Sequence, residues 1–177
     1  MMRQHQFIRS EITIHRRKPY GDNMPQEIKL TLTVNSVIDN LDDSGLPDGE
    51  PEINIFTTGG TLTLGDAGMR LSFTESENGE STTSTLYLTE EKIILKKRGA
   101  IVSDLTFREG DETVSIYRVG PYAFDMTLKT KRIRNSLSPE GGELTLLYAM
   151  NVGGQEKNVR MKISARQEKI IRTSSKA

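Results

Sequence analysis

The feature that most constrains this chain is a period-two alternation of apolar and polar residues from residue 28 to residue 165. Ile28, Leu30, Leu32 and Val34 alternate with polar residues, and 144–152 repeats the pattern over a longer stretch. Successive side chains of a strand point to opposite faces, so this spacing gathers the apolar groups on one face. The spacing of an amphipathic helix is hard to find anywhere. The sequence therefore predicts an all-β protein.

Short turn signals separate the alternating segments. Asn78-Gly79 is the dipeptide best suited to the two positive φ values of a two-residue hairpin turn. Gly59-Gly60 lies between two apolar pairs and suggests a bend or bulge. About nine or ten strands with short connections favour a closed antiparallel up-and-down barrel, because closure removes exposed sheet edges. The predicted barrel has about 8–10 strands, and a two-sheet sandwich is the alternative.

A chain of 177 residues fits one domain with tails. We expect the barrel over residues 26–168. Residues 1–25 are predicted to form a basic N-terminal arm in which 7–14 add a short strand, and 169–177 a polar C-terminal tail. Residues 39–51 form the longest acidic loop.

Charge and cysteine content limit the classes of partner and of chemistry that the chain can have. The 24 Lys and Arg residues balance the 24 Asp and Glu residues, so no global field favours nucleic acid or an anionic membrane. Cysteine is absent, which excludes disulfides, thiolate nucleophiles and cysteine-ligated metals. No segment has the apolar length of a signal peptide or a membrane span. We expect a cytoplasmic protein that binds neither nucleic acid nor membrane.

Candidate metal and catalytic groups are few. His5 and His15, the two histidines, have no acidic or histidine partner at a ligand spacing. A calcium loop from Asn40 would need Asp at its first position and Glu at its last, where the chain has Pro51. No nucleophile and base pair stands out. The sequence therefore predicts no metal, no cofactor and no enzyme activity.

Two basic clusters, 96–98 and 129–134, are candidate nucleic-acid sites. Lys129 and Lys131 oppose Leu128 in the alternation and so point to solvent, which is the ordinary way to keep a strand soluble. Aromatic residues are scarce, which further disfavours nucleic-acid binding.

Several short motifs occur in the order found in a known family. They are Thr57-Thr58-Gly59, Arg98-Gly99, Pro121-Tyr122, Leu128-Lys129-Thr130-Lys131, and Gly141-Gly142 leading to Leu144 through Tyr148. From residue 27 to residue 166 the chain resembles the YwiB-like family of uncharacterised bacterial proteins. The resemblance implies a calycin-like, lipocalin-like β-barrel, a fold shared with ligand carriers.

Strand parity nominates a ligand site. Continuing the face of Val114 and Ile116 by two residues puts Arg118 inside the barrel. Continuing the face of Met126 and Leu128 in the same way puts Arg132 inside, and the alternation also puts Tyr148 inside. Calycin-type carriers often hold a ligand carboxylate with an internal Arg–Tyr cluster. A bulge after Thr130 would instead turn Arg132 outward, and this alternative is favoured. For Arg118 the alternative is a position beyond the core, at the barrel rim, paired with an acidic neighbour.

Two functional hypotheses remain. In the first, the barrel encloses a small apolar or carboxylated molecule near Arg118, Arg132 and Tyr148. In the second, side chains fill the barrel, and its outer surface contacts a partner such as a second copy, forming a homodimer. An enzyme is the weakest hypothesis.

Overall fold

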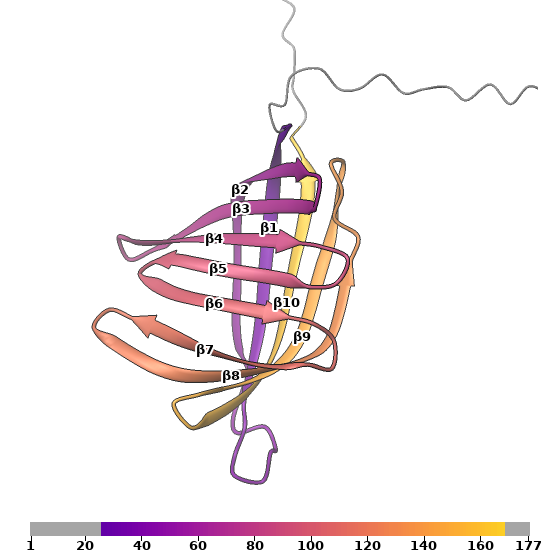
Figure 1. Ribbon diagram of the computed structural model, residues 1–177. Helices are drawn as coiled ribbons and strands as arrows, with labels where there is room; N and C mark the ends of the chain where they lie inside the picture. Colours follow the sequence, from indigo (N-terminus) through magenta and orange to yellow (C-terminus); the bar gives the residue numbers. More distant parts are fainter. Residues whose placement is uncertain (1–25, 169–177) are drawn as a thin grey trace, which may run out of the picture.

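The computed structural model describes residues 26–168, in which every regular element is a β-strand (Figure 1). The ten strands are β1 (Glu27–Asn40), β2 (Glu52–Gly65), β3 (Gly68–Glu77), β4 (Glu80–Leu88), β5 (Ile93–Gly99), β6 (Ile101–Phe107), β7 (Glu112–Val119), β8 (Tyr122–Asn135), β9 (Gly141–Val152) and β10 (Gln155–Gln167). Each strand pairs antiparallel with its neighbours in sequence, and β1 pairs with β10 to close the barrel. The predicted closed antiparallel barrel is confirmed.

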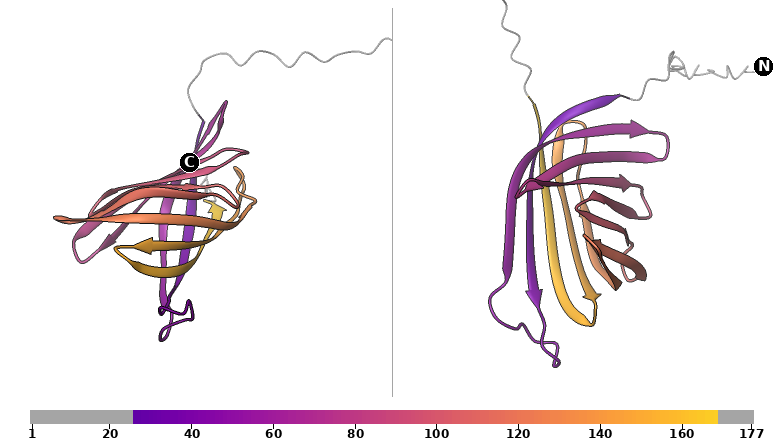
Figure 2. Two further views of the ribbon diagram at one scale, coloured as in Figure 1. Left: turned by 60° about the horizontal axis from the view of Figure 1, so that its bottom comes forward. Right: turned by 90° about the vertical axis from the view of Figure 1, so that its left-hand side faces the viewer.

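The barrel is built from two walls whose strands cross at a steep angle. Strands β1, β9 and β10 and the first part of β2 run along the back wall in Figure 1, whereas the end of β2 and strands β3 to β8 cross in front of them. Figure 2 shows the same arrangement from two further sides, with the hairpins of the front wall extending beyond the back wall. Residues 26–168 contain no helix long and apolar enough to cross a bilayer.

The alternation in β1 explains how the back wall forms. Leu30 and Leu32 are fully buried, whereas Thr31 between them and Thr33 after Leu32 are exposed. In the adjoining strand β10, Ile163 is also fully buried and lies opposite Val34. Burying a Leu or Ile side chain stabilises the fold by about 1.5–3 kcal/mol. The first half of β1 therefore fixes the inner face of the barrel.

The predicted hairpin at Asn78-Gly79 joins β3 to β4. Asn78 has φ 51° and Gly79 has φ 82°, so both residues adopt the positive φ that this turn requires. The ladder begins directly beside the turn, where Glu77 lies opposite Glu80. The local sequence thus sets the register of the first hairpin in the front wall.

Strand β2 passes through Gly59-Gly60 as one strand. Its ladder with β1 shows no register shift there, so the glycine pair does not form a bulge in that ladder. Ile53 and Ile55 before the glycines are about 60% exposed, at 58% and 62%, whereas Leu62 after them is fully buried. Phe56, which also precedes the glycines, already packs against the core, so the inner face of β2 continues from Phe56 through Gly60 to Leu62.

Some expectations fall outside the described residues. They are the basic arm 1–25 with its expected strand at 7–14, both histidines and the polar tail 169–177.

The acidic loop after β1 is described, and Asp42 Oδ1 accepts hydrogen bonds from the backbone N–H groups of Ser44 and Leu46. These bonds give the loop a local turn.

Candidate functional site at the open end of the barrel

One end of the barrel is filled with hydrocarbon. The side chains there come from both walls and are at most 1% exposed: Leu30, Leu32, Leu62, Leu71, Leu86, Phe107, Leu128, Leu144, Leu146 and Ile163. The ring of Phe107 meets that of Tyr148 edge to face. This filled end is a packed core.

At the other end, the inner face stays open to solvent. Val119 and Phe124 are each 40% exposed and Tyr122 is 67% exposed, although Phe124 and Tyr122 continue the face of the buried Met126. Val119 lies opposite Tyr122 in the β7–β8 ladder. We call this region the open end.

Four side chains form a polar group on the inner face of the front wall, between the filled end and the open end. Lys97 continues the face of Ile93 and Leu95 on β5, and it lies opposite Ser103 on β6. Glu75 is on the inner face of β3, and Tyr117 on that of β7. We call Glu75, Lys97, Ser103 and Tyr117 the interior polar cluster.

Glu75 and Lys97 are joined by an ion pair across β4. Lys97 Nζ donates to Glu75 Oε1 at 3.2 Å, and the two side chains are 24% and 29% exposed. Partial burial strengthens the attraction relative to a surface pair but also removes hydration from both charges. An ammonium carries three N–H donors. Within residues 26–168, Nζ has this single hydrogen-bond partner, so two donors remain.

The hydroxyl of Ser103 is buried without a hydrogen bond. Ser103 is 2% exposed, and its Oγ has no partner among the described residues. Buried hydroxyl groups are nearly always paired, because an unsatisfied one costs about 1–3 kcal/mol. Directly opposite residues on one face of an antiparallel ladder have Cβ atoms about 4.5–5.5 Å apart, which brings Ser103 beside Lys97.

Tyr117 of the cluster and the inward Tyr148 influence each other. Burial raises the pKa of Tyr117, and the carboxylates of Glu75 and Glu52 raise it further. Burial, followed by the influence of Tyr117, also raises the pKa of Tyr148. Because Glu75 is on β3 and Glu52 on β2, carboxylates approach Tyr117 from both walls. Both phenols are therefore neutral hydrogen-bonding groups at neutral pH.

The structure separates the three residues that parity had grouped. Tyr148 is inside and 7% exposed, as predicted. The inward orientation predicted for Arg118 is wrong: Arg118 is exposed on the outer face of β7, together with Val114 at 78% and Ile116 at 47% exposure. Val114 and Ile116 look like core residues in the sequence, whereas the inner face of β7 carries Thr113, Ser115 and Tyr117.

Arg132 is also outside the barrel. The β8–β9 ladder shifts register between Thr130 and Arg132, which leaves Arg132 exposed and turns Ile133 against the core. The bulge that we favoured after Thr130 is thus confirmed. The extra residue reverses the parity of the rest of β8.

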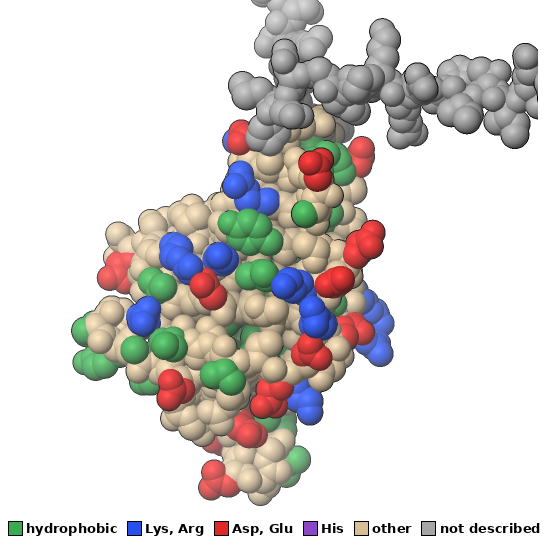
Figure 3. Space-filling model, viewed as in Figure 1, with side chains coloured by type: hydrophobic (Ala, Val, Ile, Leu, Met, Phe, Trp, Pro, Cys, Tyr) green, Lys and Arg blue, Asp and Glu red, His purple; other side chains and the backbone are tan. Residues whose placement is uncertain are grey.

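Sequence reasoning missed the interior polar cluster, although a signal for Lys97 was present. Continuing the face of Ile93 and Leu95 by two residues reaches Lys97. In the sequence, 96–98 look like one basic cluster. In the structure its members diverge: Lys96 Nζ lies 5.7 Å from the ring centre of Tyr87, and Arg98 pairs with Asp104 at 2.7 Å. Figure 3 shows basic and acidic side chains intermixed on this outer face.

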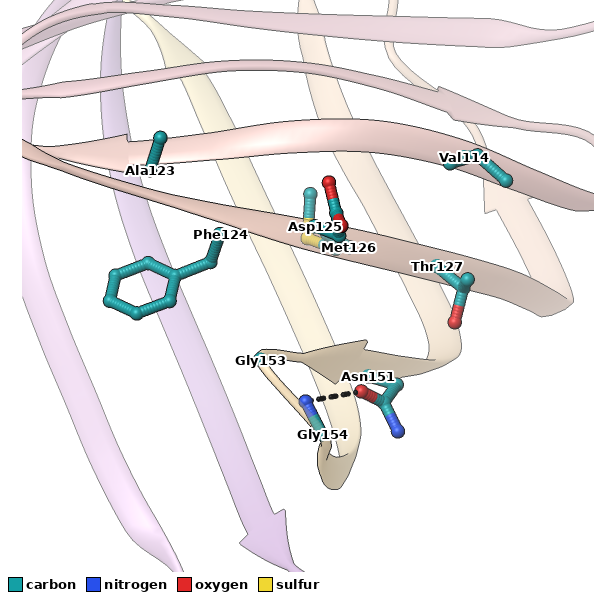
Figure 4. A pocket seen from close by; sticks show the side chains of 9 residues that line it. All are labelled: Val114, Ala123, Phe124, Asp125, Met126, Thr127, Asn151, Gly153 and Gly154. Carbon is teal, nitrogen blue, oxygen red and sulfur yellow. Dashed lines mark hydrogen bonds between the residues drawn. The ribbon is translucent and has the colours of Figure 1, made fainter.

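A shallow pocket of about 390 Å³ lies beside the open end, between β8 and the turn from β9 to β10 (Figure 4). Asn151 Oδ1 accepts a hydrogen bond from the backbone N–H of Gly154 and shapes this turn. Phe124 packs beside the same turn, since a Cβ added to Gly153 would lie 3.2 Å from its ring. A second pocket, of about 530 Å³, continues past Asn151 to Asp42 and Asp43.

Residues 26–168 contain no group of three or more acidic, histidine or cysteine side chains placed to hold a metal. The interior polar cluster offers hydrogen-bond donors and acceptors beside aromatic rings. Fold and site together define a ten-stranded antiparallel β-barrel protein with one filled end, one open end and a polar cluster between them.

The comparisons with known proteins agree with this description. Residues 44–174 match the family described as Domain of unknown function (DUF1934), and the chain belongs to that family. It is 26% identical over 136 residues to the uncharacterized beta-barrel protein YwiB of Bacillus subtilis (strain 168), covering 77% of this chain and 91% of that protein. The crystal structure of ywiB protein from Bacillus subtilis matches with a TM-score of 0.70 and 25% identity, over 82% of this chain and 96% of that one. The resemblance to the YwiB-like family is confirmed.

Proposed function

We propose that the protein is a binding module that holds a small, largely apolar molecule at the open end of the barrel. The observation that carries this proposal is the buried Ser103 hydroxyl, which lacks a partner and lies beside the half-buried Lys97. A ligand oxygen reaching both groups would satisfy the hydroxyl and use a free Lys97 donor. This polar anchor replaces the predicted Arg118 and Arg132.

Apolar side chains are available to contact the rest of the ligand. Phe56 on β2 packs against Phe73 on β3, with ring centres 6.3 Å apart. Phe124 is 40% exposed on the inner face of β8. Binding sites for small molecules commonly combine such rings with a few placed polar groups. Tyr148 would mark the inner limit of the site, where the filled end begins.

Native mass spectrometry of the protein purified from its own host would test the proposal, followed by titration with a fluorescent medium-chain lipid probe. We expect a retained small molecule and saturable uptake of the probe. Lys97→Met should weaken uptake at least about fivefold. The matched control Lys129→Met removes an exposed lysine of β8 and should leave uptake unchanged. Absence of both a retained molecule and saturable uptake would contradict the proposal.

A second candidate function is self-association, and the edge of β2 favours it. Among the described strands, residues 52–59 of β2 form a ladder only with β1, because β3 pairs from Gly60 onward. Ile53 and Ile55 are 58% and 62% exposed on this stretch. Exposed strand edges with apolar side chains are templates for pairing.

The same stretch is self-complementary about Asn54. If two copies paired antiparallel with Asn54 opposite its equivalent, Ile53 of each copy would lie opposite Ile55 of the other. Both isoleucine pairs would then be on the outer face of one continuous sheet, as an isologous interface requires. Light scattering should report a dimer that Ile53→Lys converts to a monomer. Val114→Lys, at a still more exposed apolar position on β7, is the control, and a wild-type monomer at high concentration would contradict this candidate.

A further inference from the structure

The interior polar cluster also bears on which ligand head group it fits. Lys97 already has an anionic partner, because Glu75 Oε1 lies 3.2 Å from its Nζ. A carboxylate on the ligand would compete with Glu75 for the same ammonium and meet its negative charge at close range. Like charges in a partly buried site repel strongly.

A second carboxylate adds to this repulsion. Glu52 on β2 acts on Tyr117 from the wall opposite Glu75. It accepts one hydrogen bond, from the side-chain amide of Asn54 at 2.8 Å. The other inward lysine, Lys157, lies opposite Asn40 near the loop that ends β1. The surroundings of the cluster therefore disfavour a further anion.

The interior polar cluster has both hydrogen-bond donors and a hydrogen-bond acceptor that remain unused. Lys97 retains N–H donors, and the Ser103 hydroxyl is able to donate, so both suit an acceptor oxygen. Glu75 accepts through Oε1 and carries a second carboxylate oxygen, which suits an N–H donor. An amide group presents one acceptor oxygen and N–H donors side by side without net charge.

We propose that the open end selects an apolar molecule with a neutral amide-type head, whose carbonyl oxygen accepts from Lys97 and Ser103 and whose N–H donates to Glu75. This inference rests on the proposed function and narrows it. It replaces the carboxylated ligand expected from the sequence, because the arginines expected to neutralise a carboxylate lie outside the barrel.

Isothermal titration with three alkyl probes of equal chain length tests the inference: a primary amide, the matching carboxylate and the matching primary amine. At neutral pH and moderate salt we expect the amide to bind at least about tenfold more tightly than the carboxylate or the amine. Carboxylate or amine binding equal to or tighter than amide binding overturns the inference while leaving the proposed function in place. Absence of saturable binding by all three probes overturns both.

Two single variants test the assigned contacts. Ser103→Ala should weaken amide binding about fivefold, because the variant removes one of two donors to the carbonyl oxygen. Ser72→Ala is the control, since Ser72 bonds to Thr85 on the outer face and should leave binding unchanged. Unchanged affinity in Ser103→Ala overturns the assignment of Ser103. Thermal unfolding of each variant verifies that the barrel remains folded.

Discussion

The rings of Phe107 on β6 and Tyr148 on β9 meet edge to face, with centroids 5.0 Å apart and an interplanar angle of 66°. This contact joins the front wall to the back wall at the filled end of the barrel. Phe107 is fully buried, whereas Phe124 at the open end is 40% exposed. The two phenylalanines therefore distinguish the roles of the two ends.

Phe107→Ala should lower the free energy of unfolding by about 3–5 kcal/mol, because it removes a fully buried ring and leaves a cavity. Phe124→Ala should cost about 1 kcal/mol, since less apolar surface is buried there. Urea denaturation measures both values, and the dependence of the free energy of unfolding on urea concentration should be the same in both variants and in wild type. Equal losses in the two variants would show that the open end is packed as tightly as the filled end.

Gly60 and Gly59 offer a second matched comparison. A Cβ on Gly60 would lie 2.5 Å from Cδ1 of Leu32, which is fully buried, whereas a Cβ on Gly59 meets nothing within 4 Å. Gly60→Ala should therefore destabilise the barrel by about 1–3 kcal/mol through overpacking. Gly59→Ala should be neutral or stabilise by up to about 1 kcal/mol, because alanine costs less entropy in a strand. Chemical denaturation of both variants checks the order, and greater loss in Gly59→Ala would contradict it.

Two buried threonines differ in their hydrogen bonding. Thr82 Oγ1 accepts from the backbone N–H of Ile101 at 3.2 Å, whereas Thr130 Oγ1 is buried without a partner in the described residues. Thr82→Val should cost about 1–2 kcal/mol, because it leaves that N–H unsatisfied. Thr130→Val, which keeps the side-chain shape, should be neutral or stabilise by about 1 kcal/mol. Thermal and urea unfolding provide the comparison, and destabilisation by Thr130→Val would indicate an unrecognised partner for its hydroxyl.

Acid should weaken the barrel through Glu143. Hydrogen bonds from Lys162 and then from Ser164 hold the pKa of Glu143 below its ordinary value of 4.5. A carboxyl group whose folded pKa is lowered stabilises the fold above the unfolded pKa, and this contribution is lost as the pH falls through the folded pKa. Unfolding midpoints measured from about pH 7 to about pH 3 should therefore depend less on pH in Glu143→Gln than in wild type.

The control for the acid series is Asp66→Asn, in the exposed turn between β2 and β3. We expect it to follow the wild-type pH dependence. Identical pH profiles for Glu143→Gln and wild type would show that the Lys162 ion pair, which is 2.8 Å long but largely exposed, contributes nothing measurable.

Much of the fold was predictable because its determinants are local. The alternation of β1 predicted which side chains turn inward, and Asn78-Gly79 predicted the first front-wall hairpin. The bulge at Thr130 was also predictable, because a bulge there turns the apolar Ile133 to the core and the charged Arg132 to solvent. The candidate site was harder to predict, since it depends on cross-strand neighbours such as Lys97 and Ser103.

By itself, the sequence determined that the chain forms antiparallel strands and where most of them turn, because strand parity and turn conformation depend on neighbouring residues. Tertiary structure decided which face of β7 is the inside. Val114 and Ile116 look like core residues in the sequence, yet the pairing of β7 with β8 places Ser115 beside Met126 and turns both outward. Only closure of the barrel defines an interior, so only closure could bring Glu75, Lys97, Ser103 and Tyr117 onto one inner surface and leave Arg118 outside it.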